Sequence, residues 1–262
     1  FRTLADIPQG QLVDWVLASS ACFPIFPTRL IDGERFVDGG YCDNLPIDLA
    51  IRAGAEEVVA VELHPTPTHP EYVKMPFLTT IMPRRSLGAF LDFDPETVRR
   101  NRLQGYYDAM KRFGRFDGIF YTFTRLNELR AATLGRRLMC EIAAFDAEAV
   151  RRASLRADKM VAPLIAALEA GVREAKLSFK QVLLRAVELA AAILGFPEAA
   201  IYDFDALAAR MLEALMREDA PQLETVADVE ALHRQGERRA LAALVRALQA
   251  RGSLPSEWIE AL

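Results

Sequence analysis

The sequence has few cysteines, and their number and spacing exclude the common cysteine-based sites. Its 262 residues include only Cys22, Cys42 and Cys140. An odd number without a Cys-x-x-Cys pair indicates neither a disulfide framework nor a zinc site. We therefore expect a protein of a reducing compartment, the cytoplasm, in which Cys22 and Cys42 are small apolar fillers.

Long apolar runs and concentrated positive charge are also missing. The longest strongly apolar stretch, residues 187–196, contains Glu188 and falls well short of the roughly 20 residues that a membrane-spanning helix needs. The formal net charge is -4, and no basic run is dense enough for a polybasic membrane tether. We therefore expect no nucleic-acid partner, since phosphate binding needs a concentrated cationic field, and only peripheral contact with a membrane.

The composition, 52% apolar and 26% charged, is that of an ordinary globular protein of one large or two smaller domains. Over residues 1–125, helical spacing at 11–21 ends at a Pro-rich turn, and Asp32-Gly33 between two β-prone runs predicts a hairpin. The further elements expected are helices over 46–53 and 94–113 and strands over 57–63, 77–81 and 118–123, the first of these strands being buried. Strands that alternate with helices predict an α/β fold with a mostly parallel sheet and flanking helices.

From about residue 126 to residue 262 the apolar period becomes 3.6 and predicts an all-helical region. Ser178 and Gln181 form a capping-box pattern within it. The apolar stripes run over residues 150–168, 204–215 and 241–248. The expected domains are therefore 1–125 and 126–262.

Two interpretations of this helical region remain open. Amphipathic helices must hide their stripes, so packing on the sheet domain or on one another is favoured. The other interpretation is regulation or docking at a membrane surface. The side chains that would enter such an interface are Phe179, Leu183, Leu184, Ile193, Leu194 and Phe196.

The most informative segment follows the hairpin and reads Phe36-Val37-Asp38-Gly39-Gly40-Tyr41-Cys42-Asp43-Asn44-Leu45-Pro46. It places an acid on a loop whose two glycines let the backbone approach a reacting group closely. Asp-Gly also occurs in ordinary turns, so the motif by itself leaves a plain turn residue open. The small-residue run 18–21, the apolar turn 22–27, and the helix and hydrophobic strand up to Leu63 complete the pattern. Together these blocks resemble the second half of the patatin-like lipid acyl hydrolases, over about residues 1–125.

The resemblance implies roles for four residues of this loop. Asp38 would be the acid of a Ser-Asp dyad, which accepts the serine proton without an intervening histidine and supports acyl transfer to serine and then to water. Gly39 and Gly40 would keep the path beside the carboxylate free of side chains. Asn44 would brace the loop through its amide, although a turn residue before Pro46 stays an alternative.

Patatin-like enzymes resemble one another in a Gly-rich oxyanion loop and a Gly-x-Ser-x-Gly nucleophile turn, and this sequence has neither. None of its serines has glycine two positions before and two positions after it. The sequence also starts at Phe1 without an initiator Met. We therefore expect a carboxy-terminal part of a larger polypeptide, whose amino-terminal half carries the nucleophile and is a partner of this chain. That half was cleaved, is disordered or is carried by another chain.

The resemblance implies serine-dependent hydrolysis of acyl esters in lipids, with phospholipids or lysophospholipids as the leading substrates. No metal or organic cofactor is expected. His64, His69 and Glu71 straddle prolines and lack a fourth ligand, so solvated loop residues are favoured over a metal site. The alternative function is a non-catalytic interaction or regulatory protein that retains the patatin-like fold.

Overall fold

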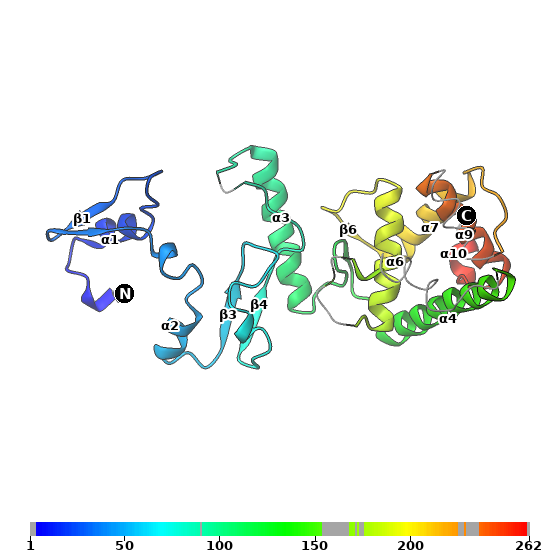
Figure 1. The fold of residues 1–262 in the computed structure, drawn as a ribbon, viewed down its shortest axis with the longest axis horizontal. Helices are drawn as coiled ribbons and strands as arrows, with labels where there is room; N and C mark the ends of the chain where they lie inside the picture. Colours follow the sequence, from blue (N-terminus) through cyan, green and yellow to red (C-terminus); the bar gives the residue numbers. More distant parts are fainter. Residues whose placement is uncertain are drawn as a thin grey trace. The chain divides into compact units, whose positions relative to one another are not determined.

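A computed structural model describes residues 4–89, 91–153, 168–170, 172, 176–224, 228 and 236–260. The chain divides into two compact units, Phe1–Met82 and Pro83–Leu262 (Figure 1). Helices and short strands alternate in the first part of the chain, and helices dominate the second. The fold is therefore α/β with a helical carboxy-terminal region. The domain boundary expected at residue 125 stays a prediction.

The first unit begins with a helix that packs on a hairpin. Helix α1 (Leu12–Ser19) ends before the Pro-rich turn, as predicted, and strands β1 (Arg29–Ile31) and β2 (Glu34–Phe36) pair antiparallel. The turn residues Asp32 and Gly33 have φ values of 50° and 83°, the left-handed conformation that a two-residue hairpin turn requires. Trp15 of α1 stacks edge-on against Phe36, with ring centroids 4.7 Å apart. This contact fixes the end of the hairpin, from which the Asp-Gly-Gly loop departs.

The rest of this unit is a small parallel sheet with one helix. The remaining elements are the short helical turns η1 (Leu4–Asp6), η2 (Gly39–Tyr41) and η3 (Pro70–Tyr72), helix α2 (Ile47–Arg52), and the parallel strands β3 (Val58–Val61) and β4 (Leu78–Ile81). Ile47, Ala60 and Leu78 are buried together between the helix and the strands. Val59 and Val61 are each 56% exposed, so the expectation that β3 is buried is wrong for this face. Among the described residues of the first unit, no element covers those two side chains.

The second unit opens with the long helix α3 (Pro95–Arg112). The Asp94 side chain accepts a hydrogen bond from the Thr97 N–H, and Gly114 follows the helix end with φ of 67°, both as predicted. The strand expected over 118–123 is reduced to β5 (Thr122–Phe123). Gly118 has φ of 113°, and a Cβ there would overlap the Tyr121 carbonyl oxygen, so the backbone turns tightly where an extended strand was expected.

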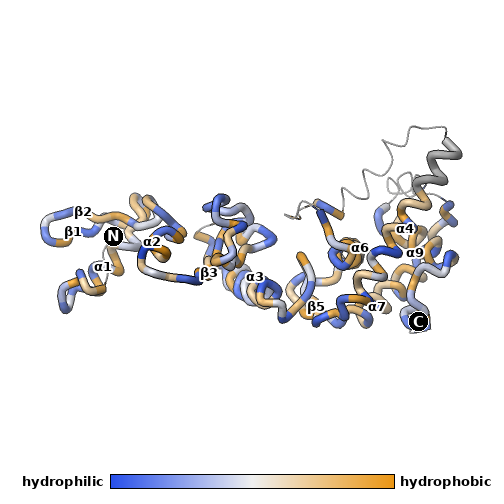
Figure 2. The backbone as a smooth tube through the Cα atoms, turned by 90° about the horizontal axis from the view of Figure 1, so that it is seen from below, coloured by the Kyte–Doolittle hydropathy of each residue, from blue (hydrophilic) through white to orange (hydrophobic). Residues whose placement is uncertain are grey.

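The helices of the second unit pack on one another around an aromatic core. Apart from α3, the helices in the described part of this unit are α4 (Glu128–Ala153), α6 (Phe179–Ile193), α7 (Phe204–Met216), α9 (Glu237–Ala250) and α10 (Ser256–Glu260). Strand β6 (Ile201–Tyr202), which was not predicted, pairs parallel with β5. The core joins Phe123, Leu183, Tyr202, Phe204 and Trp258, and Figure 2 shows hydrophobic residues recurring along the helices around it.

This packing shows which of the apolar stripes expected from the sequence are buried. The stripe over 204–215 is buried, the Ser178–Gln181 capping box is formed, and most of the stripe over 150–168 lies outside the described residues. Leu183 and Leu184 belong to the core, so they offer no membrane-docking surface, whereas Phe179 is 47% exposed. The favoured interpretation, packing of the helices on one another, is confirmed for the described helices.

Candidate active site

The structure places Asp38 at the point where the hairpin ends and the η2 turn begins. Its Oδ1 accepts a hydrogen bond from the Gly40 N–H at 2.7 Å, so Asp38 caps this turn. The Asp38 N–H donates to the carbonyl oxygen of Ala21 at 3.1 Å, which ties the loop to the end of α1. The side chain is half-buried. Among the described residues none hydrogen-bonds Oδ2, so one carboxylate oxygen is held by the protein and the other remains available.

The two glycines of the loop differ in how much space a side chain would have. A Cβ at Gly40 would lie 3.0 Å from Asn44 Oδ1 and 3.1 Å from Asp38 Oδ1, closer than side chains normally approach. A Cβ at Gly39 would meet only Ser19 Oγ, at 3.8 Å, an ordinary contact. Close approach therefore requires glycine at position 40, and the structure brings three of the predicted site residues, Asp38, Gly40 and Asn44, together.

Ser19, at the end of α1, is a neighbour of the loop that sequence reasoning did not single out. Its hydroxyl lies beside Gly39, and its side chain is exposed. It does not stand on the strand-to-helix turn that exposes a nucleophile, because its backbone closes the last turn of a helix. Ser19 thus borders the site without the geometry of an activated serine.

The cysteines near the loop do not fill a core. Cys22 is partly buried, and Cys42 is exposed, so the expectation that both are small apolar fillers is wrong for Cys42. The Tyr41 hydroxyl donates to the Phe23 carbonyl oxygen and lies 3.8 Å from Cys22 Sγ. Tyr41 therefore links the Asp-Gly-Gly loop to the Pro-rich turn that precedes the hairpin.

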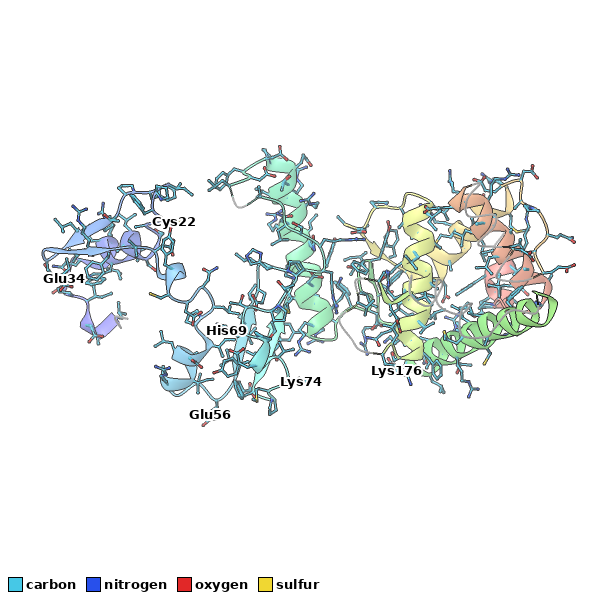
Figure 3. The ribbon with its side chains drawn as sticks, in the orientation of Figure 1. Cys22, Glu34, Glu56, His69, Lys74 and Lys176 are labelled. Atoms are coloured by element: carbon cyan, nitrogen blue, oxygen red, sulfur yellow. The ribbon has the colours of Figure 1, made fainter. Side chains whose placement is uncertain are left out.

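His69, labelled in Figure 3, joins a second loop to the site. Its Nε2 lies 3.2 Å from Asp43 Oδ1 and its Nδ1 lies 3.1 Å from Glu71 Oε1, so each ring nitrogen faces a carboxylate. The His69 side chain is 26% exposed, so this loop residue is partly solvated, and Asp43 and Glu71 pair with its two ring nitrogens. The hydrogen bond with Asp43, and then that with Glu71, raise the pKa of His69 against the opposing effect of burial.

Asp43 is the other residue that sequence reasoning missed. Its Oδ1 accepts a hydrogen bond from the Leu45 N–H at 2.9 Å, which closes the turn before Pro46. This backbone hydrogen bond, followed by the one with His69, lowers the pKa of Asp43. Asp43 therefore performs the turn-closing role that had been the alternative for Asn44. The available signal was an aspartate two positions before Leu45, in the turn that leads into Pro46.

The described residues contain no group of three or more His, Cys, Asp or Glu side chains that could hold a metal ion. Within the same residues, no helix combines the length and the apolar character needed to cross a membrane.

Comparison with known protein families gives a match on the part of the chain that contains this loop. Residues 2–51 match the sequence model of the family described as patatin-like phospholipase. The matched segment runs from the residues before α1 to helix α2 and includes Asp38, Gly39, Gly40 and Asn44. No curated protein and no solved structure gives a significant match to the chain.

The match confirms the resemblance inferred from the motif. Over residues 2–51 the chain is similar to patatin-like phospholipases, a family of lipid acyl hydrolases. The segment covers about a fifth of the chain. The resemblance inferred for residues 52–125 stays a prediction.

Proposed function

We propose that this chain supplies Asp38 as the acid of a Ser-Asp dyad that hydrolyses acyl esters in lipids, with phospholipids or lysophospholipids as substrates. The observation that carries the proposal is the way the carboxylate is held. Oδ1 is fixed by the Gly40 N–H, and Oδ2 has no hydrogen-bond partner among the described residues. A carboxylate oriented through one oxygen can accept a proton at the other without rearranging its loop.

The chemistry needs a serine that this sequence does not hold in a nucleophile turn. In the proposed reaction, Asp38 takes the hydroxyl proton as the serine oxygen attacks the ester carbonyl carbon. The alcohol then leaves with that proton, and an acyl-serine remains. Water, deprotonated by the same carboxylate, releases the fatty acid and restores the serine. We assign the serine and the oxyanion-binding amides to the amino-terminal half of the parent protein.

The surface of the first unit supports such a partner. Large apolar side chains are exposed on α1, on the Pro-rich turn and on β3, and they include Val13, Val16, Phe23, Phe26, Val59 and Val61. Monomeric proteins rarely expose extended apolar patches that serve no contact. Exposed apolar side chains on α1 and on the Pro-rich turn suit a covering segment of polypeptide and, at the finished site, the acyl chain of a lipid.

The decisive experiment replaces Asp38 with Asn in the polypeptide that combines this chain with its nucleophile-bearing half. Asn keeps the size of the side chain and its hydrogen bond from Gly40, but it cannot take the serine proton. We expect turnover of a phospholipid to fall by about 100-fold or more, on the order of 3 kcal/mol in the barrier. Retention of near-normal hydrolysis in a folded Asp38→Asn variant would refute the role of Asp38.

Two further variants make the result specific. Asp32→Asn is the matched control, because Asp32 sits in the hairpin turn with φ of 50°, a conformation that Asn also adopts readily. Its activity should equal that of the unaltered protein. Ser19→Ala tests whether the neighbouring serine is the nucleophile, and we expect it to keep both activity and labelling by a fluorophosphonate probe. If neither the chain nor its combination with the other half hydrolyses lipid, the non-catalytic interaction protein becomes the better description.

A further inference from the structure

The second unit contains a cavity whose lining residues all lie outside the matched segment, residues 2–51. It has a volume of about 380 Å³ and is bordered by α3, by the segment around Phe120 and Thr122, and by the loop that precedes β6. This volume lies in the lower part of the range of small-molecule sites, roughly 300–1,000 Å³. Its size therefore suits a compact metabolite, and its lining indicates which chemistry that metabolite has.

The lining carries an excess of positive charge. The ionisable side chains around the cavity are the cations Arg84, Arg85, Arg100 and Lys111 and the carboxylates Asp108 and Glu198. Four cations against two carboxylates leave an excess of two positive charges. The Arg85 guanidinium is held by Glu198 and lies over the Phe120 ring, 4.3 Å from its centroid. A concave site with this balance attracts an anion.

The floor of the cavity holds polar groups whose hydrogen bonds are incomplete. The side chain of Lys111 is 11% exposed, and its ammonium lies 3.0 Å from Asp108 Oδ1 and 3.2 Å from the Ile119 carbonyl oxygen. These contacts use two of its three N–H donors. Thr122 is 1% exposed, and neither its hydroxyl nor Asp108 Oδ2 has a hydrogen-bond partner in the described part of the chain. Buried polar groups are normally paired, so these atoms point to a ligand that pairs them.

We propose that this cavity binds a small organic phosphate that carries hydroxyl groups. Guanidinium groups match the oxygens of a phosphate, and the remaining N–H of Lys111 adds a donor at the floor. Asp108 is a hydrogen-bond acceptor, which a phosphate oxygen does not satisfy and a ligand hydroxyl does. The ring of Tyr107 supplies an apolar wall for the carbon skeleton, whereas guanidinium groups of Arg85 and Arg185 lie over the Phe120 ring. This site does not depend on the proposed role of Asp38.

The test is calorimetric titration of the full 262-residue chain with glycerol 3-phosphate, a compact probe that carries a phosphate and two hydroxyl groups. Arg100→Gln removes one cation of the rim and should weaken binding about tenfold, the usual worth of a charge-assisted hydrogen bond. Arg99→Gln is the matched control on the same helix, because Arg99 pairs with Glu96 at 3.0 Å and does not line the cavity. Its affinity should be unchanged.

A second variant keeps the test independent of folding defects. Thr122→Val preserves volume and removes only the unpaired hydroxyl, so the melting temperature should not fall while affinity for glycerol 3-phosphate does. Glycerol should not bind, and inorganic phosphate should bind more weakly than glycerol 3-phosphate. Absence of glycerol 3-phosphate binding, an equal loss in Arg99→Gln and Arg100→Gln, or unchanged affinity in both Arg100→Gln and Thr122→Val would overturn the proposal.

The glycerophosphate group occurs both as a free molecule and as a lipid headgroup, and a competition distinguishes the two. Vesicles that contain phosphatidylglycerol displace bound glycerol 3-phosphate if the headgroup enters the cavity. They leave it bound if the cavity takes only the free ester. Either result supports the phosphate site, provided that the variants change the affinity as stated above. The result also shows whether the bound phosphate ester is a free molecule or a lipid headgroup.

Discussion

Gly135 lies where α4 meets the first turn of α6, and its replacement by alanine tests how the helical unit is packed. A Cβ at this position would overlap the carbonyl oxygen of Phe179 and lie 2.6 Å from its carbonyl carbon. Carbon atoms in contact are about 3.5–4.0 Å apart, so α6 must retreat by roughly 1 Å. Because Phe179 meets the new methyl with its backbone, no side-chain rotation relieves the overlap.

The retreat also disturbs a cluster of charges at the start of α6. The Lys180 ammonium lies 2.8 Å from Asp117 and 2.6 Å from Glu128, and Lys180 is 8% exposed. Overpacking costs about 1–3 kcal/mol, and weakening a largely buried pair adds to that cost. We expect Gly135→Ala to lower the free energy of unfolding by about 3 kcal/mol, which corresponds to a fall of about 6–12 °C in melting temperature for a unit of this size.

Thermal unfolding followed by circular dichroism measures this effect, and the chain offers a matched control. Gly105 lies in the interior of α3, where a Cβ would meet nothing within 4 Å. Gly105→Ala should stabilise the protein by about 0.5–1 kcal/mol, since alanine loses less backbone entropy in a helix. If Gly135→Ala melts at or above the temperature of Gly105→Ala, the close approach of α4 to α6 is wrong.

Two further predictions concern charged groups. The pKa of His69 is higher in the folded protein than in the unfolded chain, where it is near 6.5. The stability that the protonated ring contributes is therefore complete below pH 6.5 and is lost as the pH rises through the folded-state pKa. An NMR titration of the ring should therefore give a pKa above 6.5 that falls in Asp43→Asn, and no fall would contradict the contact. Glu188→Ala should cost about 3–5 kcal/mol in urea unfolding, because it leaves the buried Arg185 guanidinium, now 3.0 Å from the carboxylate, without its counter-charge. A cost below about 1 kcal/mol would show that this buried pair is not formed.

Elements with local signals could be predicted from the sequence. The hairpin follows from Asp32-Gly33, the start of α3 from Asp94 and the start of α6 from Ser178, because a turn or a cap is decided by a few neighbouring residues. Strand β6 could not be predicted, since its two residues become a strand only by pairing with β5. The exposure of Val59 could not be predicted either, because composition shows that a strand is apolar and not what covers it.

The candidate site, too, has residues that the sequence could predict and residues that it could not. The Asp-Gly-Gly motif located Asp38, and the resemblance supplied an expectation for each neighbour. The contact of His69 with Asp43 joins residues 26 positions apart, and nothing in the local pattern of either residue indicates it. Sequence reasoning assigned His69 to solvent because it weighed the histidine only as a metal ligand. A long-range ion pair between two loops requires the fold to be known.

The first unit has a small core for its length, and this bears on how the proposed site would be assembled. Its buried apolar cluster consists of Ile47, Ala60 and Leu78, while β3 and α1 leave valines exposed. Apolar burial stabilises by roughly 25 cal/mol per Å², so side chains left in water contribute little to this unit. On the proposed assembly, the nucleophile-bearing half would cover that surface and stabilise the Asp38 loop by mass action, as any partner of the folded state does. Stability of the unit and completion of the catalytic dyad would then both depend on the nucleophile-bearing half.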